Sequence, residues 1–244
     1  SLKTFLMERM ILTSAQKALK INLNENIYGT FAEIGAGQEV VRHFFRSGGA
    51  SGTVAKTMSA YDKDFSDAIY GEEKNGRYVT EPRLRKMLDH EYGLIIQRLN
   101  RDHNPDKCFF TYANTVATIN FTRKFKGHGW MGLRFQLSPE QQPNDVIFHI
   151  RMKEEEASLQ QETIGVMGVN LVYGCFHLCN NPEELLKSLY DNIAKYKVEI
   201  DMIHFEGPEF QKVDNRLMSL KLLKNEMTDA VIFGPEGNNI LPAA

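Results

Sequence analysis

Strand-like and helix-like patterns of apolar residues alternate along the chain. Residues 27–35 and 52–62 carry the β-branched and aromatic side chains of strands, and residues 37–46 between them read as a helix that opens on glycine. Residues 80–100 have apolar side chains at helical spacing, with Thr80 as the expected N-cap. The first hundred residues therefore predict strands whose connections contain helices.

Three further strands are predicted close together, at residues 107–119, 129–137 and 145–153, and a long helix follows them over residues 154–179. The second half of that helix is almost wholly apolar, which predicts its burial. The remaining predicted elements are an amphipathic amino-terminal helix with Leu6, Met7, Met10 and Ile11 on one side, helices at 181–196 and 213–227, and strands at 198–207 and 229–237.

This succession predicts an α/β fold with a mixed, partly parallel sheet and helices packed on it. The closely spaced middle strands favour antiparallel pairing, and the strand–helix succession of the last third favours parallel pairing. We expect a single α/β domain over residues 1–244. Because the chain stops shortly after the turn at residues 234–237, we also expect it to be the amino-terminal part of a longer protein.

Composition narrows the class of protein. Hydrophobic residues make up 42% of the 244 residues and the formal net charge is -2, as in an ordinary globular protein. This charge balance argues against a dedicated nucleic-acid binder and leaves a local basic patch open. No apolar run is long enough to span a membrane, and three cysteines are an odd number for a disulfide framework. We therefore expect a cytoplasmic protein with buried thiols and without nucleic-acid or membrane partners.

The first candidate site is the turn that contains Gly35 and Gly37. A strand, a tight glycine turn and a helix start can present backbone N–H groups to an anion. A dinucleotide fingerprint needs a third glycine where Val40 stands, so the pattern is incomplete. The alternative is a plain strand-to-helix turn.

The second candidate is the glycine-rich stretch that ends in Lys56 and Thr57. A phosphate-binding P-loop places Lys and Ser/Thr after two glycines, and here Ala50 and Ala55 stand at the glycine positions. Residues 58–65 do not resemble the helix that such a loop requires. The alternative is a glycine-rich loop that leads into a strand.

The third candidate is a group of carboxylates at Asp62, Asp64 and Asp67, where the second strand is expected to end. Sites in α/β sheets form at strand ends. We expect Asp62 and Asp64 either to act as acid–base groups or, together with Asp67, to hold a divalent cation. The alternative is a solvated turn.

The fourth candidate surrounds Trp130, the only tryptophan. Arg134 and Gln136 share its strand and lie on one face by alternation. Trp130 could stack on an aromatic ring while Arg134 holds a phosphate. The alternative is a core tryptophan with a surface arginine.

The fifth candidate is a pair of histidines on apolar strands. His149 shares a face with Arg151, and His204 shares a face with Glu206. Both histidines are candidates for acid–base catalysis. The alternative for each is a hydrogen-bonded core residue.

Four segments, residues 31–71, 129–136, 149–152 and 160–174, resemble an uncharacterised bacterial protein family that is well represented in cyanobacteria. Relatives carry inherited names such as nicotinate-nucleotide adenylyltransferase or TonB-dependent receptor. Neither name fits: the string at residues 127–130 lacks the second histidine of the adenylyltransferase phosphate motif, and long helices do not suit an outer-membrane receptor. The resemblance therefore implies no particular reaction.

Two functional hypotheses follow. In the first, the chain binds a nucleotide or another phosphorylated small molecule, with or without catalysis. Gly35, Gly37, Lys56 and Arg134 then hold the ligand, together with Thr57, Trp130 and Gln136. In the second, the chain is a non-enzymatic scaffold that packs against a further domain or against a second copy in a homo-oligomer. The apolar stretch at residues 164–178 favours the second hypothesis.

Overall fold

A six-stranded mixed sheet forms the centre of the computed structural model, which describes residues 8–241. The strand order is β2-β1-β3-β4-β5-β6. The strands are β1 (Ile27–Ile34), β2 (Val54–Met58), β3 (Cys108–Ala117), β4 (His128–Phe135), β5 (Asn144–Met152) and β6 (Val198–Glu206). β1 pairs in parallel with β2 and β3. The pairs β3–β4, β4–β5 and β5–β6 are antiparallel. The predicted α/β fold with a mixed sheet is confirmed.

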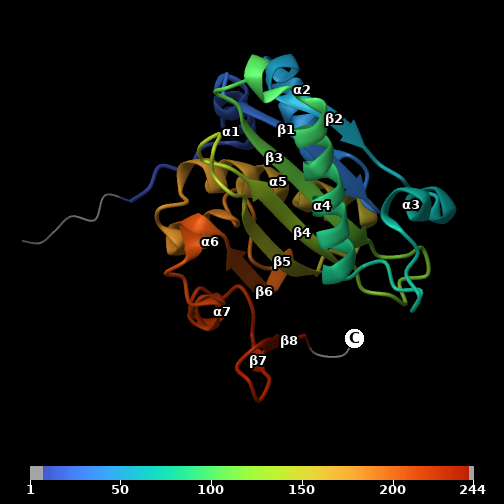
Figure 1. Ribbon diagram of the computed structural model, residues 1–244. Helices are drawn as coiled ribbons and strands as arrows, with labels where there is room; N and C mark the ends of the chain where they lie inside the picture. The colour runs from blue at the N-terminus through green and yellow to red at the C-terminus, as the bar shows by residue number, and fades with distance from the viewer. Residues whose placement is uncertain (1–7, 242–244) are drawn as a thin grey trace, which may run out of the picture.

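Helices cover both faces of this sheet (Figure 1). One face carries α4 (Glu81–Arg98), which packs on β1, β3 and β4, with α3 (Lys63–Tyr70) beside it. As predicted, the Thr80 side chain caps α4 by accepting a hydrogen bond from Arg83 N. The helices of the other face are α1 (Ser14–Asn22), α2 (Glu39–Arg46), α5 (Ala157–His177), α6 (Pro182–Ser188) and α7 (Asn215–Lys224).

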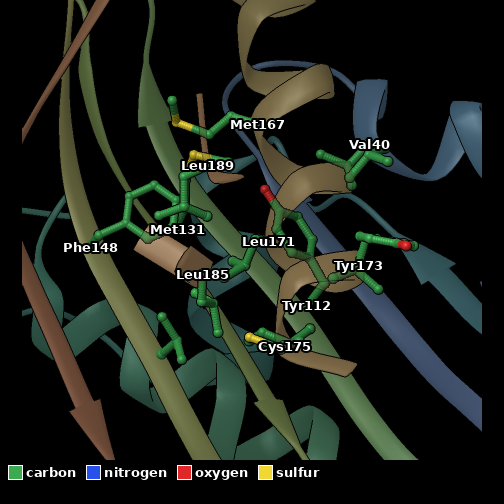
Figure 2. Packing of buried hydrophobic residues seen from close by; sticks show 14 of the residues in the cluster. Val40, Tyr112, Met131, Phe148, Met167, Leu171, Tyr173, Cys175, Leu185 and Leu189 are labelled. Carbon is green, nitrogen blue, oxygen red and sulfur yellow. The ribbon is translucent and has the colours of Figure 1, made fainter. Parts of the chain in front are cut away.

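The largest part of the core lies between α5 and the sheet (Figure 2). Tyr112, Met131 and Phe148 point from the strands toward Met167 and Leu171 of α5, and all five side chains are fully buried. Each such side chain contributes about 1.5–3 kcal/mol relative to exposure. The apolar stretch that favoured a scaffold is therefore covered within the chain's own core, as its composition predicted.

The expectation of parallel pairing in the last third is wrong, because β6 runs antiparallel to β5. After β5 the chain runs out along α5 and then returns beside it, where the Asn170 side chain donates to the backbone carbonyls of Leu189 and Asp191. This return brings Val198 opposite Met152, at the end of the sheet that the chain had left. A single crossing helix would have given a parallel pair.

Three smaller expectations also need correction. The amino-terminal helix begins only at Ser14, because Thr13 and Gln16 form a capping box; Met10 and Ile11 precede it, and Leu6 and Met7 lie outside the described residues. Residues 63–70 do form a helix, α3. The segment 229–237 contributes only β7 (Ile232–Phe233), which pairs with β8 (Asn239–Ile240) in a separate hairpin.

No helix within residues 8–241 is long and apolar enough to cross a membrane. Cys108, Cys175 and Cys179 are all buried free thiols, as the odd cysteine number predicted.

The close contact between α5 and α2 gives a first prediction. A Cβ atom added at Gly168 would lie 2.3 Å from Val40 Cγ2, inside a core without room to relax. Gly168→Ala should therefore lower the free energy of unfolding by about 1–3 kcal/mol. Urea denaturation measures this loss.

Gly93→Ala in α4 is the matched control. A Cβ atom at Gly93 meets nothing within 4 Å, so alanine there should stabilise the helix by up to about 1 kcal/mol. Equal effects of the two substitutions would contradict the packing of α5 on α2.

Candidate functional site

An open cavity of about 1130 Å³ lies at the edge of the sheet where β3 and β5 end and β4 begins. This is also the edge that holds the carboxyl ends of the parallel strands, where ligand sites of α/β sheets form. The walls come from the α3–α4 connection, the loop between β3 and β4, the end of β5 and the last described residues, including Asn239 and Leu241. The volume is sufficient for a nucleotide-sized ligand.

Three polar side chains form a chain of hydrogen bonds from the sheet into this cavity. Asp201 Oδ1 lies 2.6 Å from His149 Nδ1, and His149 Nε2 lies 3.1 Å from His128 Nδ1. The Asp201 and His149 side chains are almost fully buried, and the His128 side chain is half-buried and lines the cavity. The buried carboxylate is thus connected to the cavity through two imidazoles.

The direction of these hydrogen bonds follows from the carboxylate. An ionised Asp201 can only accept, so His149 Nδ1–H donates to it and His149 Nε2 must accept. His128 Nδ1–H then donates to His149, which leaves the lone pair on His128 Nε2. No described residue hydrogen-bonds to His128 Nε2. The connected side chains therefore present a basic nitrogen at the cavity.

A β-bulge in β6 aims Asp201 at this network. His149 lies opposite Met202 and Ile150 lies opposite Ile200, so Asp201 is the extra residue of the bulge. Its second oxygen, Oδ2, accepts from Arg151 Nε at 2.6 Å. The bulge thus turns a carboxylate toward the face that carries His149.

The pKa shifts of His128 and Asp201 favour the protonation states that this hydrogen-bond direction requires. Burial, together with the nearby His149 and Arg151, lowers the pKa of His128. Burial alone would raise the pKa of Asp201, but the hydrogen bonds and charges of His149 and Arg151 lower it overall. At neutral pH, Asp201 is therefore ionised and His128 is an unprotonated base.

Cationic side chains outnumber carboxylates among the residues that line the cavity. Six line it, against four carboxylates. Within residues 8–241, five of the six form no ion pair: Arg77, Arg123, Lys124, Lys126 and Lys153. The chain as a whole has a net charge of -2, so the cavity is locally more positive than the average surface. Such a site favours anionic ligands.

Two aromatic residues flank the histidines. The Trp130 ring is buried and its centroid lies 5.0 Å from that of His149, so this indole mainly packs against the network. Phe125, by contrast, is 43% exposed, and its ring centroid lies 5.8 Å from that of His128. Phe125 is therefore the aromatic surface that a ligand can reach.

The Gly35–Gly37 turn lies at the same edge of the sheet but has its own internal partners. Glu33, which is buried, accepts hydrogen bonds from Val40 N and Val41 N at the start of α2. The Tyr61 hydroxyl bonds to Gly37 N. A side chain at Gly35 would collide with Val116 O, so this glycine permits close approach of two strands. The helix start is already occupied by a carboxylate.

The buried Glu33 gives a second prediction. Burial raises its pKa to about 7, although the two backbone hydrogen bonds oppose the shift. The folded protein then binds more protons than the unfolded chain between pH 4.5 and 7, so stability falls as pH rises through that window. The contribution is about 3 kcal/mol at most.

Glu33→Gln tests this predicted pH dependence of stability, because glutamine does not titrate. Urea denaturation at pH 5 and pH 8 should show a pH-dependent loss in the wild type that the variant lacks. Parallel profiles for the two proteins would show that Glu33 titrates normally.

Lys56 and Thr57 lie on β2, away from the cavity. Lys56 forms an ion pair with the buried Glu91 of α4, and Thr57 Oγ1 accepts from the Gln38 side chain. Both side chains thus link neighbouring elements, and neither lines the cavity.

The three aspartates after β2 also have structural surroundings. Asp62 is the N-cap of α3, accepting from Phe65 N at 2.9 Å. Asp67 accepts from the Tyr78 hydroxyl and pairs with Arg83, and Asp64 is exposed. Within residues 8–241, no three His, Cys, Asp or Glu side chains come together as a metal site.

Arg134 and Gln136 lie at the end of β4 opposite His128. Arg134 bonds to Asp145 and Asp89, and the Gln136 side chain donates to the carbonyls of Pro139 and Gln141. Trp130 is therefore the only one of these three residues that lines the cavity.

His204 lies outside the cavity, with Nε2 at 3.4 Å from Glu206 and a side chain that is 40% exposed. Of the sequence-based candidates, the structure brings His149 and Trp130 together. Sequence reasoning missed His128, Asp201 and the cations of the β3–β4 loop. His128 could have been found from the sequence, because it lies two residues before Trp130 and so on the same face of the strand.

Comparisons with known proteins show similarity to solved structures alone. No protein-family model matches the chain, and no curated protein matches it. A competence/damage-inducible protein from Agrobacterium tumefaciens shares 14% identity over 67% of this chain and 97% of its own, with a TM-score of 0.44. A CinA superfamily protein from Enterobacter cloacae shares 11% sequence identity, with 72% of this chain and 99% of that chain covered and a TM-score of 0.43. A CinA superfamily protein from Klebsiella pneumoniae shares 8% sequence identity, with 67% of this chain and 95% of that chain covered and a TM-score of 0.44.

These findings overturn the resemblance to the uncharacterised bacterial family. The motifs that carried it match no family model, and the structures that match are competence/damage-inducible proteins. Residues 31–71 supply β2 and the second half of β1, and residues 129–136 and 149–152 supply most of β4 and the end of β5, so the quoted segments form two adjacent strand pairs with β3 between them. At these identities, the likeness to the solved structures concerns the fold alone.

Proposed function

We propose that the cavity binds a nucleotide or another phosphorylated small molecule and that His128 acts on it as a general base. The observation that carries this proposal is the arrangement of Asp201, His149 and His128, which ends in a basic nitrogen in a cavity lined by six cationic side chains. The cations hold the phosphate, and the aromatic ring of Phe125 offers a surface for the rest of the ligand.

The geometry supports one kind of chemical step. His128 Nε2 takes a proton from a water molecule or a ligand hydroxyl, and the positive charge that forms on the imidazole is shared through His149 with Asp201. The oxygen of that water or hydroxyl bonds to phosphorus while the bond from phosphorus to the leaving oxygen breaks, and the leaving oxygen takes its proton from the His128 imidazolium or from water. Lys126 and Arg123 stabilise the negative charge on the phosphate during this exchange. This combination suits hydrolysis or group transfer at a phosphorylated substrate.

Ligand binding can be tested by thermal unfolding with a panel of ATP, NAD, nicotinate mononucleotide, sugar phosphates and phosphate, each with and without Mg²⁺ and Mn²⁺. A ligand present at a hundred times its dissociation constant stabilises the fold by about 2.7 kcal/mol. For a chain of this length, the expected rise in Tm is about 5–10 °C.

Lys126→Glu should reduce that rise, because it reverses a charge at the cavity. Lys212→Glu is the matched control, since Lys212 is exposed and lies outside the cavity. A panel in which no compound raises the Tm, or equal losses in both variants, would contradict a phosphate site at this place.

A further inference from the structure

The loop between β3 and β4, residues 118–127, combines exposed aromatic rings with cations that form no ion pair with any residue of the described part, 8–241. Phe121 is fully exposed and Phe125 is 43% exposed. Arg123, Lys124 and Lys126 alternate with them, and the ten residues contain no Asp or Glu. Aromatic rings interleaved with cations are the composition by which proteins bind single strands, with rings for the bases and cations for the phosphates.

The ends of this loop are held in place by buried groups. Ile119 N donates to Gln160 Oε1 of α5 at 2.7 Å, and Met152 N donates to Gly127 O at 2.9 Å. A Cβ atom at Gly127 would lie 2.5 Å from Gln160 Oε1, so only glycine allows this close approach. The loop is thus anchored at both ends and projects its middle outward.

The exposed side chains continue the cavity onto the outer surface. Arg123, Lys124 and Phe125 line the cavity, whereas Phe121 does not. A ligand confined to the cavity would leave Phe121 without a partner. A ligand that uses both aromatic residues must therefore extend out of the cavity along the loop.

We propose that the 118–127 loop binds single-stranded nucleic acid, with one nucleotide of the strand in the cavity and its neighbours along the loop. Bases stack on Phe125 and Phe121, and the loop cations contact the backbone phosphates. The proposal rests on the proposed function, because the nucleotide in the cavity is the ligand assigned there. A duplex is disfavoured, since its bases are stacked on one another and offer the rings no free face.

Net charge alone gave the opposite expectation, because it averages over the chain. The three loop cations lie in a segment without Asp or Glu, and with Arg77, Arg151 and Lys153 they outnumber the four carboxylates of the cavity, whereas acidic residues are in excess over the whole chain. Binding should accordingly weaken with salt. For single strands the slope of log K against log salt is about -0.7 for each phosphate contacted, or about -2 for the three loop cations.

Fluorescence anisotropy with a 5′-labelled 12-nucleotide oligothymidylate tests the proposal, with the matching mononucleotide and a 12-base-pair duplex as comparisons. Phe121→Ala should weaken oligonucleotide binding about 5- to 150-fold and leave mononucleotide binding unchanged. Tyr196→Ala is the matched control. Tyr196 is 73% exposed between two lysines, but those lysines pair with Glu226 and Glu154. Tyr196→Ala should therefore leave the affinity for the oligonucleotide unchanged.

The outcomes separate this inference from the proposed function. If the mononucleotide binds and the oligonucleotide binds no more tightly, the inference is overturned and the proposed function stands. If neither binds, both fail. Equal affinity for the duplex would also overturn the inference, as would phosphatidylserine vesicles that bind in place of oligonucleotide and lose affinity with Phe121→Ala.

Discussion

Turnover of the ligand selected by the thermal panel is expected to fall about 10²- to 10⁴-fold when His128 is replaced by glutamine. Glutamine keeps a polar side chain at the cavity wall but has no basic nitrogen. Because the cations and Phe125 remain, the dissociation constant of the ligand should change little. Steady-state kinetics together with calorimetric titration of the same variant measure the two quantities separately.

His204→Gln is the control for this substitution. His204 is also a strand histidine with a partly exposed side chain, but it lies outside the cavity. A His128→Gln variant that retains full turnover, or a His204→Gln variant that loses as much, would contradict the role assigned to His128.

Asp201→Asn is expected to lower both stability and turnover. Removal of the buried charge breaks the buried pair of Asp201 with His149, at a cost of about 3–5 kcal/mol. The asparagine amide can also donate to His149 Nδ1, which would force His149 Nε2–H toward His128 and remove the acceptor that fixes the His128 tautomer. Turnover should then fall nearly as far as in His128→Gln.

Urea denaturation measures the loss of stability, and ¹⁵N NMR of the histidine rings reports which nitrogen carries the proton. Asp214→Asn is the matched control, because Asp214 is an exposed N-cap and asparagine caps helices equally well. A native ¹⁵N pattern in Asp201→Asn would show that Asp201 does not set the tautomers.

Most of the fold could be predicted because local patterns and tertiary structure agree. The apolar second half of α5 predicted its burial, and Thr80 predicted the start of α4. The direction of β6 could not be predicted in this way. It depends on the chain returning beside α5, which rests on long-range contacts such as those of Asn170.

The site was only partly predictable, for a specific physical reason. Strict alternation in β6 would place Asp201 on the face of Ile203, which packs in the core under α5. The bulge changes the phase, so that Asp201 instead reaches His149. No feature of the local sequence marks the bulge. Charged candidates such as Lys56 and Asp62 were easier to see, and they proved to have partners in neighbouring elements.

The bulge at Asp201 also makes the site sensitive to the length of the strand and not only to its composition. Loss of a single residue there would restore regular pairing between β5 and β6 and leave the hydrophobic positions on both sides of the strand intact. The residue lost would be Asp201 itself, so the sheet could keep its core while the two imidazoles lost their carboxylate. In evolutionary terms, one deletion separates a chain that carries this hydrogen-bond network from a related chain that keeps the fold without it.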